Sequence, residues 1–149
     1  MRTFSFAPTL AAMLLASALS LPAAAAGQAV TMLKNPSCEC CDKWAAILDT
    51  SGFSVKTVVQ ANLAPVKDMM GVPAGLRSCH TALVGGYVVE GHVPADLVRK
   101  LLTDKPRIAG IAAPGMPPSS PGMDVPGVKQ PYQVIAFQKN GQTSVYAQR

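Results

Sequence analysis

Three of the four cysteines of the chain stand within four residues, as Cys38, Cys40 and Cys41, and the fourth, Cys79, is followed directly by His80. Two kinds of chemistry need thiols this close together. Thiolates are the ligands that select copper(I) and other soft ions. The C-x-x-C spacing of Cys38 and Cys41 is also that of a dithiol that exchanges disulfides. We favour a metal site and keep a thiol-disulfide oxidoreductase, with Cys38 and Cys41 as its reactive pair, as the alternative.

The spacing within the cluster favours more than one metal ion. Structural zinc sites place their cysteines in pairs on two arms, each pair separated by two to four residues. Cys40 and Cys41 are adjacent, and on a helix they would diverge by about 100°. One tetrahedral ion would take Cys38, Cys40 and Cys41 together only with difficulty, whereas sulfurs that bridge several copper(I) ions tolerate the crowding. The prediction is therefore a polynuclear copper(I) site.

The first 26 residues are typical of a secretory signal peptide. Arg2 provides the positive start, residues 7–21 are largely apolar, and residues 24–26 are the small residues that signal peptidase accepts. The apolar run is short beside the roughly 20 residues of a membrane-spanning helix. We expect cleavage before Gly27, no stable membrane anchor afterwards, and a single domain over residues 27–149. The predicted compartment is the periplasm, an oxidising space where exposed thiols pair or bind metal.

The charge of the chain does not indicate a nucleic-acid partner. The formal net charge is +5 at pH 7, but the basic residues are scattered and only 5% of the residues are aromatic. Nucleic-acid sites instead combine clustered Lys and Arg with aromatic side chains. We expect copper ions, and no nucleic acid, as the partner of the cluster.

The elements that must position the cluster alternate between strands and helices. Apolar spacing and turn residues predict, in order, strand 29–33, helix 40–50, strand 53–59, helix 63–70, strands 81–84 and 87–90, helix 94–102, and strands 132–137 and 143–146. Two-glycine and Asn-Gly turns predict that each of the last two strand pairs is a hairpin. The fold class is therefore α/β, with the order β-α-β-α-β-β-α of a thioredoxin-like arrangement followed by a C-terminal hairpin.

Residues 106–131 differ in composition from the rest of the chain, with seven prolines, four glycines and no sustained period. We expect a long Pro/Gly/Met-rich loop here. Within it, Pro-Gly-Met occurs twice, ending at Met116 and Met123. Pro-Gly suits the centre of a type II turn, so each turn would present its methionine, and thioethers bind copper(I). Met116 and Met123 are candidate ligands, with simple loop packing as the alternative.

The register of the first hairpin brings the remaining donors toward the cluster. If the two glycines form the turn, Thr81 faces Glu90 and Cys79 faces His92, and such opposed residues lie about 4.5–5.5 Å apart at Cα. The three-cysteine segment lies where the first strand turns into the first helix, and open α/β sheets bind ligands at that end. We expect Cys79, His80 and His92 to join it there. Taken singly, each histidine suits a hydrogen-bonded role and Cys79 a buried thiol equally well.

Four motifs resemble the CopG-like family of exported copper-resistance proteins, which was long described as a domain of unknown function. They are Cys38-x-Cys40-Cys41-x-x-Trp44, Ser78-Cys79-His80-Thr81-Ala82, Glu90-Gly91-His92-Val93-Pro94, and the run that joins Gly115-Met116-Pro117 to Ser120-Pro121-Gly122-Met123. The resemblance covers residues 30–124. It implies a thioredoxin-like fold, copper binding through the cysteines, and a role in periplasmic copper tolerance that includes interconversion of copper(I) and copper(II). One departure from thioredoxins is that no proline precedes the third strand. Cys79 stands in that neighbourhood, which argues against ordinary disulfide exchange.

Three functions stay open on this reading. The chain could sequester copper(I), exchange disulfides, or pass copper to another periplasmic or membrane copper-handling protein, and its residues do not decide whether it is an enzyme. The candidate metal ligands are Cys38, Cys40, Cys41, Cys79, His80, His92, Met116 and Met123. Met32, Trp44, Met69 and Met70 are expected in the core.

Overall fold

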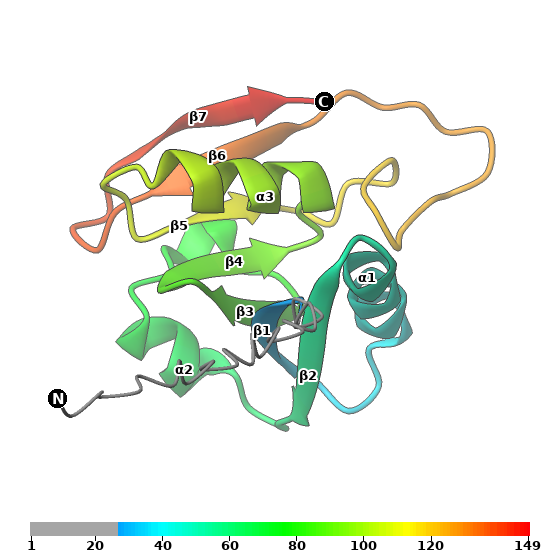
Figure 1. Ribbon diagram of the computed structural model, residues 1–149, viewed down its shortest axis with the longest axis horizontal. Helices are drawn as coiled ribbons and strands as arrows, with labels where there is room; N and C mark the ends of the chain where they lie inside the picture. The colour runs from blue at the N-terminus through cyan, green and yellow to red at the C-terminus, as the bar shows by residue number, and fades with distance from the viewer. Residues whose placement is uncertain (1–26) are drawn as a thin grey trace, which may run out of the picture.

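The computed structural model describes residues 27–149, so the predicted signal peptide at 1–26 lies outside the described residues. The elements are β1 (Gln28–Lys34), α1 (Glu39–Thr50), β2 (Phe53–Val59), α2 (Ala64–Met69), the 3-10 turn η1 (Ala74–Leu76), β3 (His80–Val84), β4 (Tyr87–Gly91), α3 (Ala95–Asp104), β5 (Gly110–Ala113), β6 (Gln133–Phe137) and β7 (Thr143–Gln148). The strands form one mixed sheet in the order β2-β1-β3-β4-β5-β6-β7 (Figure 1). Within residues 27–149, no helix combines the length and the apolar character that a membrane crossing requires.

The predicted α/β order is present from β1 to α3. β1 pairs with β2 in parallel and with β3 antiparallel, and β3 and β4 form the predicted hairpin. Its register is the expected one, with Thr81 opposite Glu90 and Val84 opposite Tyr87. Both turn glycines have positive φ angles of 55° and 85°, which explains why this tight turn needs glycine. β6 and β7 form the second predicted hairpin.

One strand lies where the sequence predicted only loop. β5 pairs in parallel with β4 and antiparallel with β6, and all four of its residues are buried. A short strand that is buried on both faces shows no alternation of polar and apolar residues, which is why the sequence did not reveal it. Gly110 is required at its start, since a Cβ there would lie 2.1 Å from the carbonyl oxygen of Val88. The Pro/Gly/Met-rich loop is therefore shorter than predicted and spans residues 114–132.

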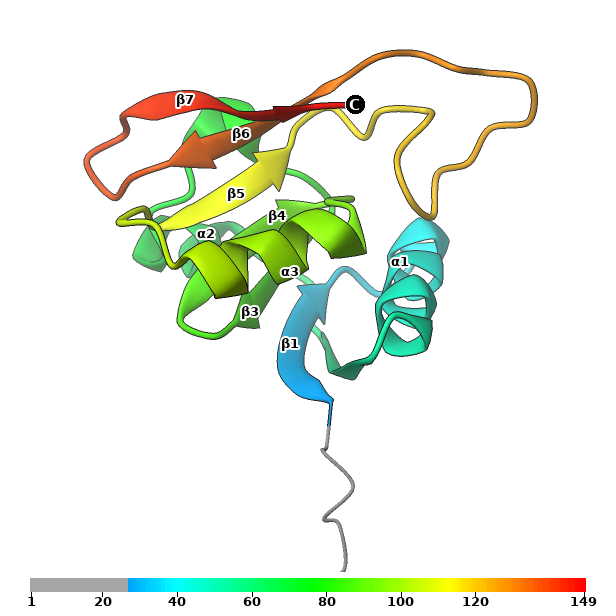
Figure 2. The same ribbon diagram turned by 45° about the horizontal axis from the view of Figure 1, so that its top comes forward.

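Helices cover both faces of the sheet. Side chains of α1 and α3, among them Trp44 and Val98, pack with Val89 in the larger core cluster. The neighbouring Val88 belongs to a smaller cluster on the other face, with Val72 from the segment that follows α2. Successive strand residues point to opposite faces, so α1 and α3 share one face and the α2–η1 segment covers the other (Figure 2).

Two of the four expected core residues are confirmed, and Met70 is half-buried against the smaller core cluster. Trp44 and Met32 are fully buried, but Met69 is 76% exposed, so its placement in the core was wrong. The residue of α2 that faces the sheet is Lys67, which is 5% exposed. Leu63 and Lys67 are four residues apart and share a helix face, and Met69 lies on the opposite side.

Candidate metal centre

The four cysteines meet between the first turn of α1 and the start of β3. Their sulfur atoms all lie within 4.8 Å of one another. Cys38 caps α1, and Cys40 and Cys41 follow within its first turn, while Cys79 directly precedes β3. The Sγ of Cys41 lies 3.3 Å from that of Cys79, and the Sγ of Cys38 lies 3.5 Å from that of Cys40. The fold thus brings together residues that are 38 positions apart.

Cys38 and Cys41 are joined in a disulfide, and Cys40 and Cys79 are free thiols. This is the pair that the oxidoreductase alternative requires. Metal ligation needs thiolates, so the disulfide withholds two of the four sulfurs until it is reduced. The cluster therefore has an oxidised form with two thiols and a reduced form with four.

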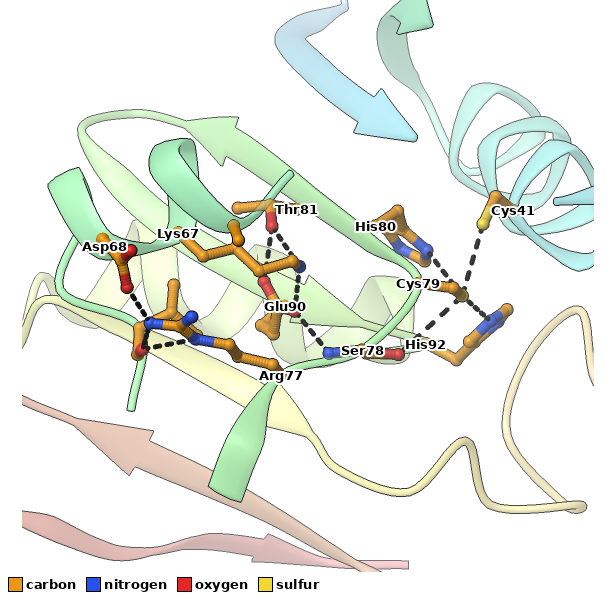
Figure 3. A network of polar contacts seen from close by, with 12 residues as sticks. Cys41, Lys67, Asp68, Arg77, Ser78, Cys79, His80, Thr81, Glu90 and His92 are labelled. Carbon is orange, nitrogen blue, oxygen red and sulfur yellow. Dashed lines mark hydrogen bonds and ion pairs between the residues drawn. The ribbon is translucent and has the colours of Figure 1, made fainter. Parts of the chain in front are cut away.

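Both histidines lie beside Cys79. The Sγ of Cys79 is 3.6 Å from Nε2 of His92 and 3.8 Å from Nδ1 of His80 (Figure 3). The three residues form a second group of donor atoms within 4.8 Å, and both imidazoles are fully buried. Nδ1 of His92 lies 2.8 Å from the carbonyl oxygen of Pro121 and donates to it, which leaves Nε2 free to accept a metal ion. Nε2 of His80 has no hydrogen-bond partner among the described residues.

Burial sets the protonation of this group. It raises the pKa of the Cys79 thiol to about 11, although a hydrogen bond with Ser78 acts in the opposite direction. It lowers the pKa of His80 to about 3, with repulsion from His92 and Lys67 adding to the effect, and it also lowers the pKa of His92. At neutral pH both imidazoles are therefore neutral and Cys79 is a thiol. Such a thiol is a poor nucleophile, and a metal ion that binds it must displace its proton.

A cleft of about 510 Å³ opens at the cluster. Its lining consists of Asn35, Ser37, Cys38, Glu39, Cys40 and Cys79. Cys41 is fully buried, whereas Cys40 and Cys79 are partly exposed. An ion that enters from solvent therefore meets the two free thiols first.

The second Pro-Gly-Met turn lies against α1, and the first does not. A Cβ on Gly122 would lie 2.9 Å from the backbone nitrogen of Trp44 and 3.0 Å from the carbonyl oxygen of Cys40, whereas one on Gly115 would meet nothing within 4 Å. Both glycines have positive φ angles, as Pro-Gly turns require. The structure thus separates two methionines that the sequence treats alike: Met123 is half-buried beside the seated glycine, and Met116 is 40% exposed.

Trp44 and an ion pair fix α1 beside the cluster. Nε1 of Trp44 donates to the carbonyl oxygen of Val93 at 2.8 Å, and its ring centroid lies 4.5 Å from that of His80. Lys34, at the end of β1, is 4% exposed and pairs with Asp42 of α1 at 2.5 Å. The first half of the helix is therefore tied both to β1, through Asp42, and to the segment that follows His92, through Trp44.

A buried polar cluster that was not predicted from the sequence lies behind Cys79. Glu90 accepts hydrogen bonds from the backbone N–H of Ser78 at 2.6 Å, from the hydroxyl of Thr81 at 2.6 Å and from the ammonium of Lys67. Lys67 and Glu90 are 5% and 0% exposed. A signal was present, because a glutamate ends the valine-rich strand and the predicted register set it opposite a threonine.

The chain is similar to one described protein family and to two solved structures. A family model described as a protein of unknown function, DUF411, matches residues 76–123, which include Cys79, both histidines and both Pro-Gly-Met turns. Among curated proteins, no sequence is similar enough to count as a match. Two solved structures are named copper resistance protein CopG, Form 1 and Form 2. Each is 39% identical to the chain, with a TM-score of 0.78, and the match covers 83% of this chain and 98% of theirs.

Proposed function

The chain belongs to the family of the copper resistance protein CopG, and on this premise we propose that it binds copper(I) through the reduced thiolates of Cys38, Cys40, Cys41 and Cys79. The observation that carries the proposal is the gathering of four sulfur atoms within 4.8 Å at a cleft. Thiolates select copper(I) among the common ions, and bridging sulfurs accommodate more than one ion. The function is copper resistance, by holding copper(I) in a form that other molecules cannot reach.

Imidazole and thioether groups complete the proposed ligand set. His92 presents Nε2 toward Cys79, and His80 presents Nδ1 to the same sulfur. Met123 belongs to the turn that lies on α1, so its thioether is the better placed of the two, and Met116 is the outer candidate. Both imidazoles are neutral at physiological pH, which is the state that ligates copper.

The proposal places the copper centre on a thioredoxin-like scaffold in the periplasm. The order β1-α1-β2-α2-β3-β4-α3 supports the scaffold, and the alanine-rich residues 1–26 support export. Residues 27–149 would form the single mature domain. An oxidising compartment also accounts for a cluster that is found with one disulfide.

The disulfide adds a redox role to the proposal. Oxidation of the Cys38 and Cys41 thiols to the disulfide releases two electrons and two protons, and two copper(II) ions take up the electrons to become two copper(I) ions. The reverse reaction restores the thiols. Interconversion of copper oxidation states is therefore balanced within this one site, with copper as the substrate.

A second candidate function is thiol-disulfide exchange with another protein, favoured by the disulfide between Cys38 and Cys41. It requires those two residues and gives no role to Cys79 or the histidines. The raised pKa of Cys79 weighs against that thiol as a nucleophile in such exchange. Reduction of a disulfide substrate that needs Cys38 and Cys41, and not Cys79, would identify this function.

Copper titration of the mature protein tests the proposal. Residues 27–149 are reduced and handled without oxygen, and copper(I) binding is measured by competition with a chromophoric chelator. We expect more than one copper(I) ion per chain and sulfur-to-copper charge-transfer absorption. Cys40→Ser should lose most of the capacity, while Lys43→Ser, an exposed position one turn further along α1, should keep it. Full copper capacity in Cys40→Ser would sink the cluster proposal.

A further inference from the structure

A buried ion pair lies behind the metal centre, and among the described residues its hydrogen-bond partners are Ser78 and Thr81, not candidate ligands. Lys67 comes from α2 and Glu90 from β4, and the pair is on the face of the sheet that α2 covers. Removing two charges from water costs several kcal/mol per ion, and apolar residues of the same size often give a more stable fold. Packing alone does not account for charged residues at this position.

Glu90 binds three donors from three segments of the chain. Its Oε1 accepts from the Lys67 ammonium and from the backbone N–H of Ser78, and its Oε2 accepts from the Thr81 hydroxyl. The Lys67 ammonium also donates to the Thr81 hydroxyl at 2.7 Å. An ionised carboxylate has enough lone pairs for all of these donors, and Lys67 balances its charge.

The contact with Ser78 matters because Cys79 lies beyond the sheet ladder. The pairing of β3 with β1 begins at His80 and its pairing with β4 begins at Thr81. The N–H of Ser78 donates to Glu90 and to no backbone carbonyl among the described residues. The carboxylate therefore holds the residue that directly precedes Cys79.

The chain before Ser78 is fastened to the same side. The Arg77 guanidinium pairs with Asp68 and donates to the carbonyl oxygen of Val72 at 3.1 and 3.2 Å. Gly91 allows Ser78 to approach β4, since a Cβ at that glycine would lie 2.8 Å from the Ser78 hydroxyl. Cys79 thus stands at the end of a segment that is held from the α2 face and reaches toward α1.

From these contacts we propose that Glu90, balanced by Lys67, is a positioning residue for the metal centre, which holds Ser78 and so sets the place of the Cys79 sulfur. Cys79 belongs to both donor groups, being 3.3 Å from Cys41 and 3.6 Å from His92. Metal sites tolerate errors of only about 0.2 Å in ligand distance. The part of this inference that concerns metal affinity rests on the proposed copper function.

Two double variants test the hydrogen bonds that residue 90 makes to Ser78 and Thr81. Lys67→Met/Glu90→Gln and Lys67→Met/Glu90→Leu both remove the two charges, so neither leaves an unpaired buried ion. They differ in that Gln keeps an oxygen that accepts from the Ser78 N–H and a second polar atom near the Thr81 hydroxyl, whereas Leu keeps neither. We expect the Leu variant to lose about 10–100-fold in copper(I) affinity, the usual effect of losing a partner behind a ligand, and the Gln variant to stay near the wild-type affinity.

A measurement without copper separates this inference from the proposed function. With Cys38→Ser and Cys40→Ser added, only Cys41 and Cys79 remain, and the equilibrium of their disulfide with glutathione reports how closely the two sulfurs are held. This equilibrium gives the effective concentration of one thiol toward the other. We expect it to be at least tenfold lower in the Glu90→Leu variant than in the Glu90→Gln variant. If no variant binds copper but the disulfide equilibrium still differs, the copper function fails and the positioning role stands.

The wild-type protein provides a third readout that needs no variant to fold. Hydrogen exchange should show the Ser78 amide as strongly protected as the amides of β3, although it lies outside the ladder. Exchange at the rate of an unstructured amide would overturn the proposal. Equal copper affinity and equal disulfide equilibrium in the Leu and Gln variants would overturn it as well.

Discussion

The two Pro-Gly-Met turns allow a matched test of whether the loop must lie on α1. Gly122→Ala and Gly115→Ala make the same change in the same tripeptide. Both glycines have a positive φ, 83° and 73°, so both variants carry the cost of a left-handed L-residue, roughly 1–2 kcal/mol. The two positions differ in their surroundings, because only the Cβ at 122 would meet the backbone of α1.

The difference between the two variants follows from that contact. The atoms at 2.9 and 3.0 Å are backbone atoms of Trp44 and Cys40, so no flexible side chain can move aside. Overpacking of this kind costs about 1–3 kcal/mol. The turn at Gly122 can avoid the clash by lifting off α1, at the cost of the hydrogen bond from His92 to Pro121, about 0.5–1.5 kcal/mol. We therefore expect the turn to lift while the sheet stays folded.

Urea unfolding, hydrogen exchange and copper competition together measure the effect. Gly122→Ala should be less stable than Gly115→Ala by about 0.5–1.5 kcal/mol, the cost of lifting the turn, and the amides of residues 122–124 should lose protection only in the first variant. Its copper(I) affinity should fall about 10–100-fold, because His92 loses the partner that orients its ring. Equal stability, exchange and copper affinity in the two variants would refute the argument that the seated turn supports the centre.

Three further variants test the surroundings of the site and the strand that the sequence did not reveal. Trp44→Phe should lower the free energy of unfolding, measured with urea, by about 1–3 kcal/mol or more, because the carbonyl that accepts from Trp44 is left buried and unpaired. An unchanged midpoint would show that this bond has no net value. His80→Asn should flatten the acid side of the stability profile of the metal-free protein. The pKa of His80 is about 3 in the folded protein and 6.5 ordinarily, so the neutral imidazole contributes fully to stability above pH 6.5. Below that pH the unfolded chain binds the proton more readily, and the free energy of unfolding falls by about 1.36 kcal/mol per pH unit, or about 2 kcal/mol at pH 5. An equal slope of stability against pH in the variant and the wild type would contradict the lowered pKa of His80. Gly110→Ala should lower the free energy of unfolding by about 3 kcal/mol through overpacking. Gly75→Ala has open space around it, so it should unfold at nearly the wild-type urea concentration. Equal midpoints for these two glycine variants would be inconsistent with β5.

Much of the site could be predicted because a two-residue turn sets the register of its whole hairpin. Once the Gly-Gly turn was located, the pairing of Thr81 with Glu90 followed, and so did the closeness of Cys79 and His92. The position of the three-cysteine segment followed from a strand that turns into a helix. These inferences need only local geometry.

Other features depend on contacts that are distant in sequence. β5 has no period of its own and is a strand only because β4 and β6 flank it. Lys67 resembles any surface lysine in sequence, and its burial depends on Glu90 from a strand 23 residues later. The two methionine turns have the same three residues, and only the packing of Gly122 on α1 distinguishes them. The sequence left open whether Cys38 and Cys41 bind metal or form a disulfide pair, and the structure contains the disulfide between them.

The anchoring of the loop has a consequence for the time course of copper exchange. Residues 114–132 leave the sheet after β5 and return in β6, its direct neighbour, so the two ends stay about one strand spacing apart even when the turn lifts. Closure of a loop of about ten residues takes about 10–100 ns. A chelator at micromolar concentration meets the site only about once per millisecond, even at a diffusion-limited 10⁹ M⁻¹s⁻¹. A lifted turn thus returns long before most competitors arrive, so under the proposed copper function it would protect bound copper by speed as well as by affinity.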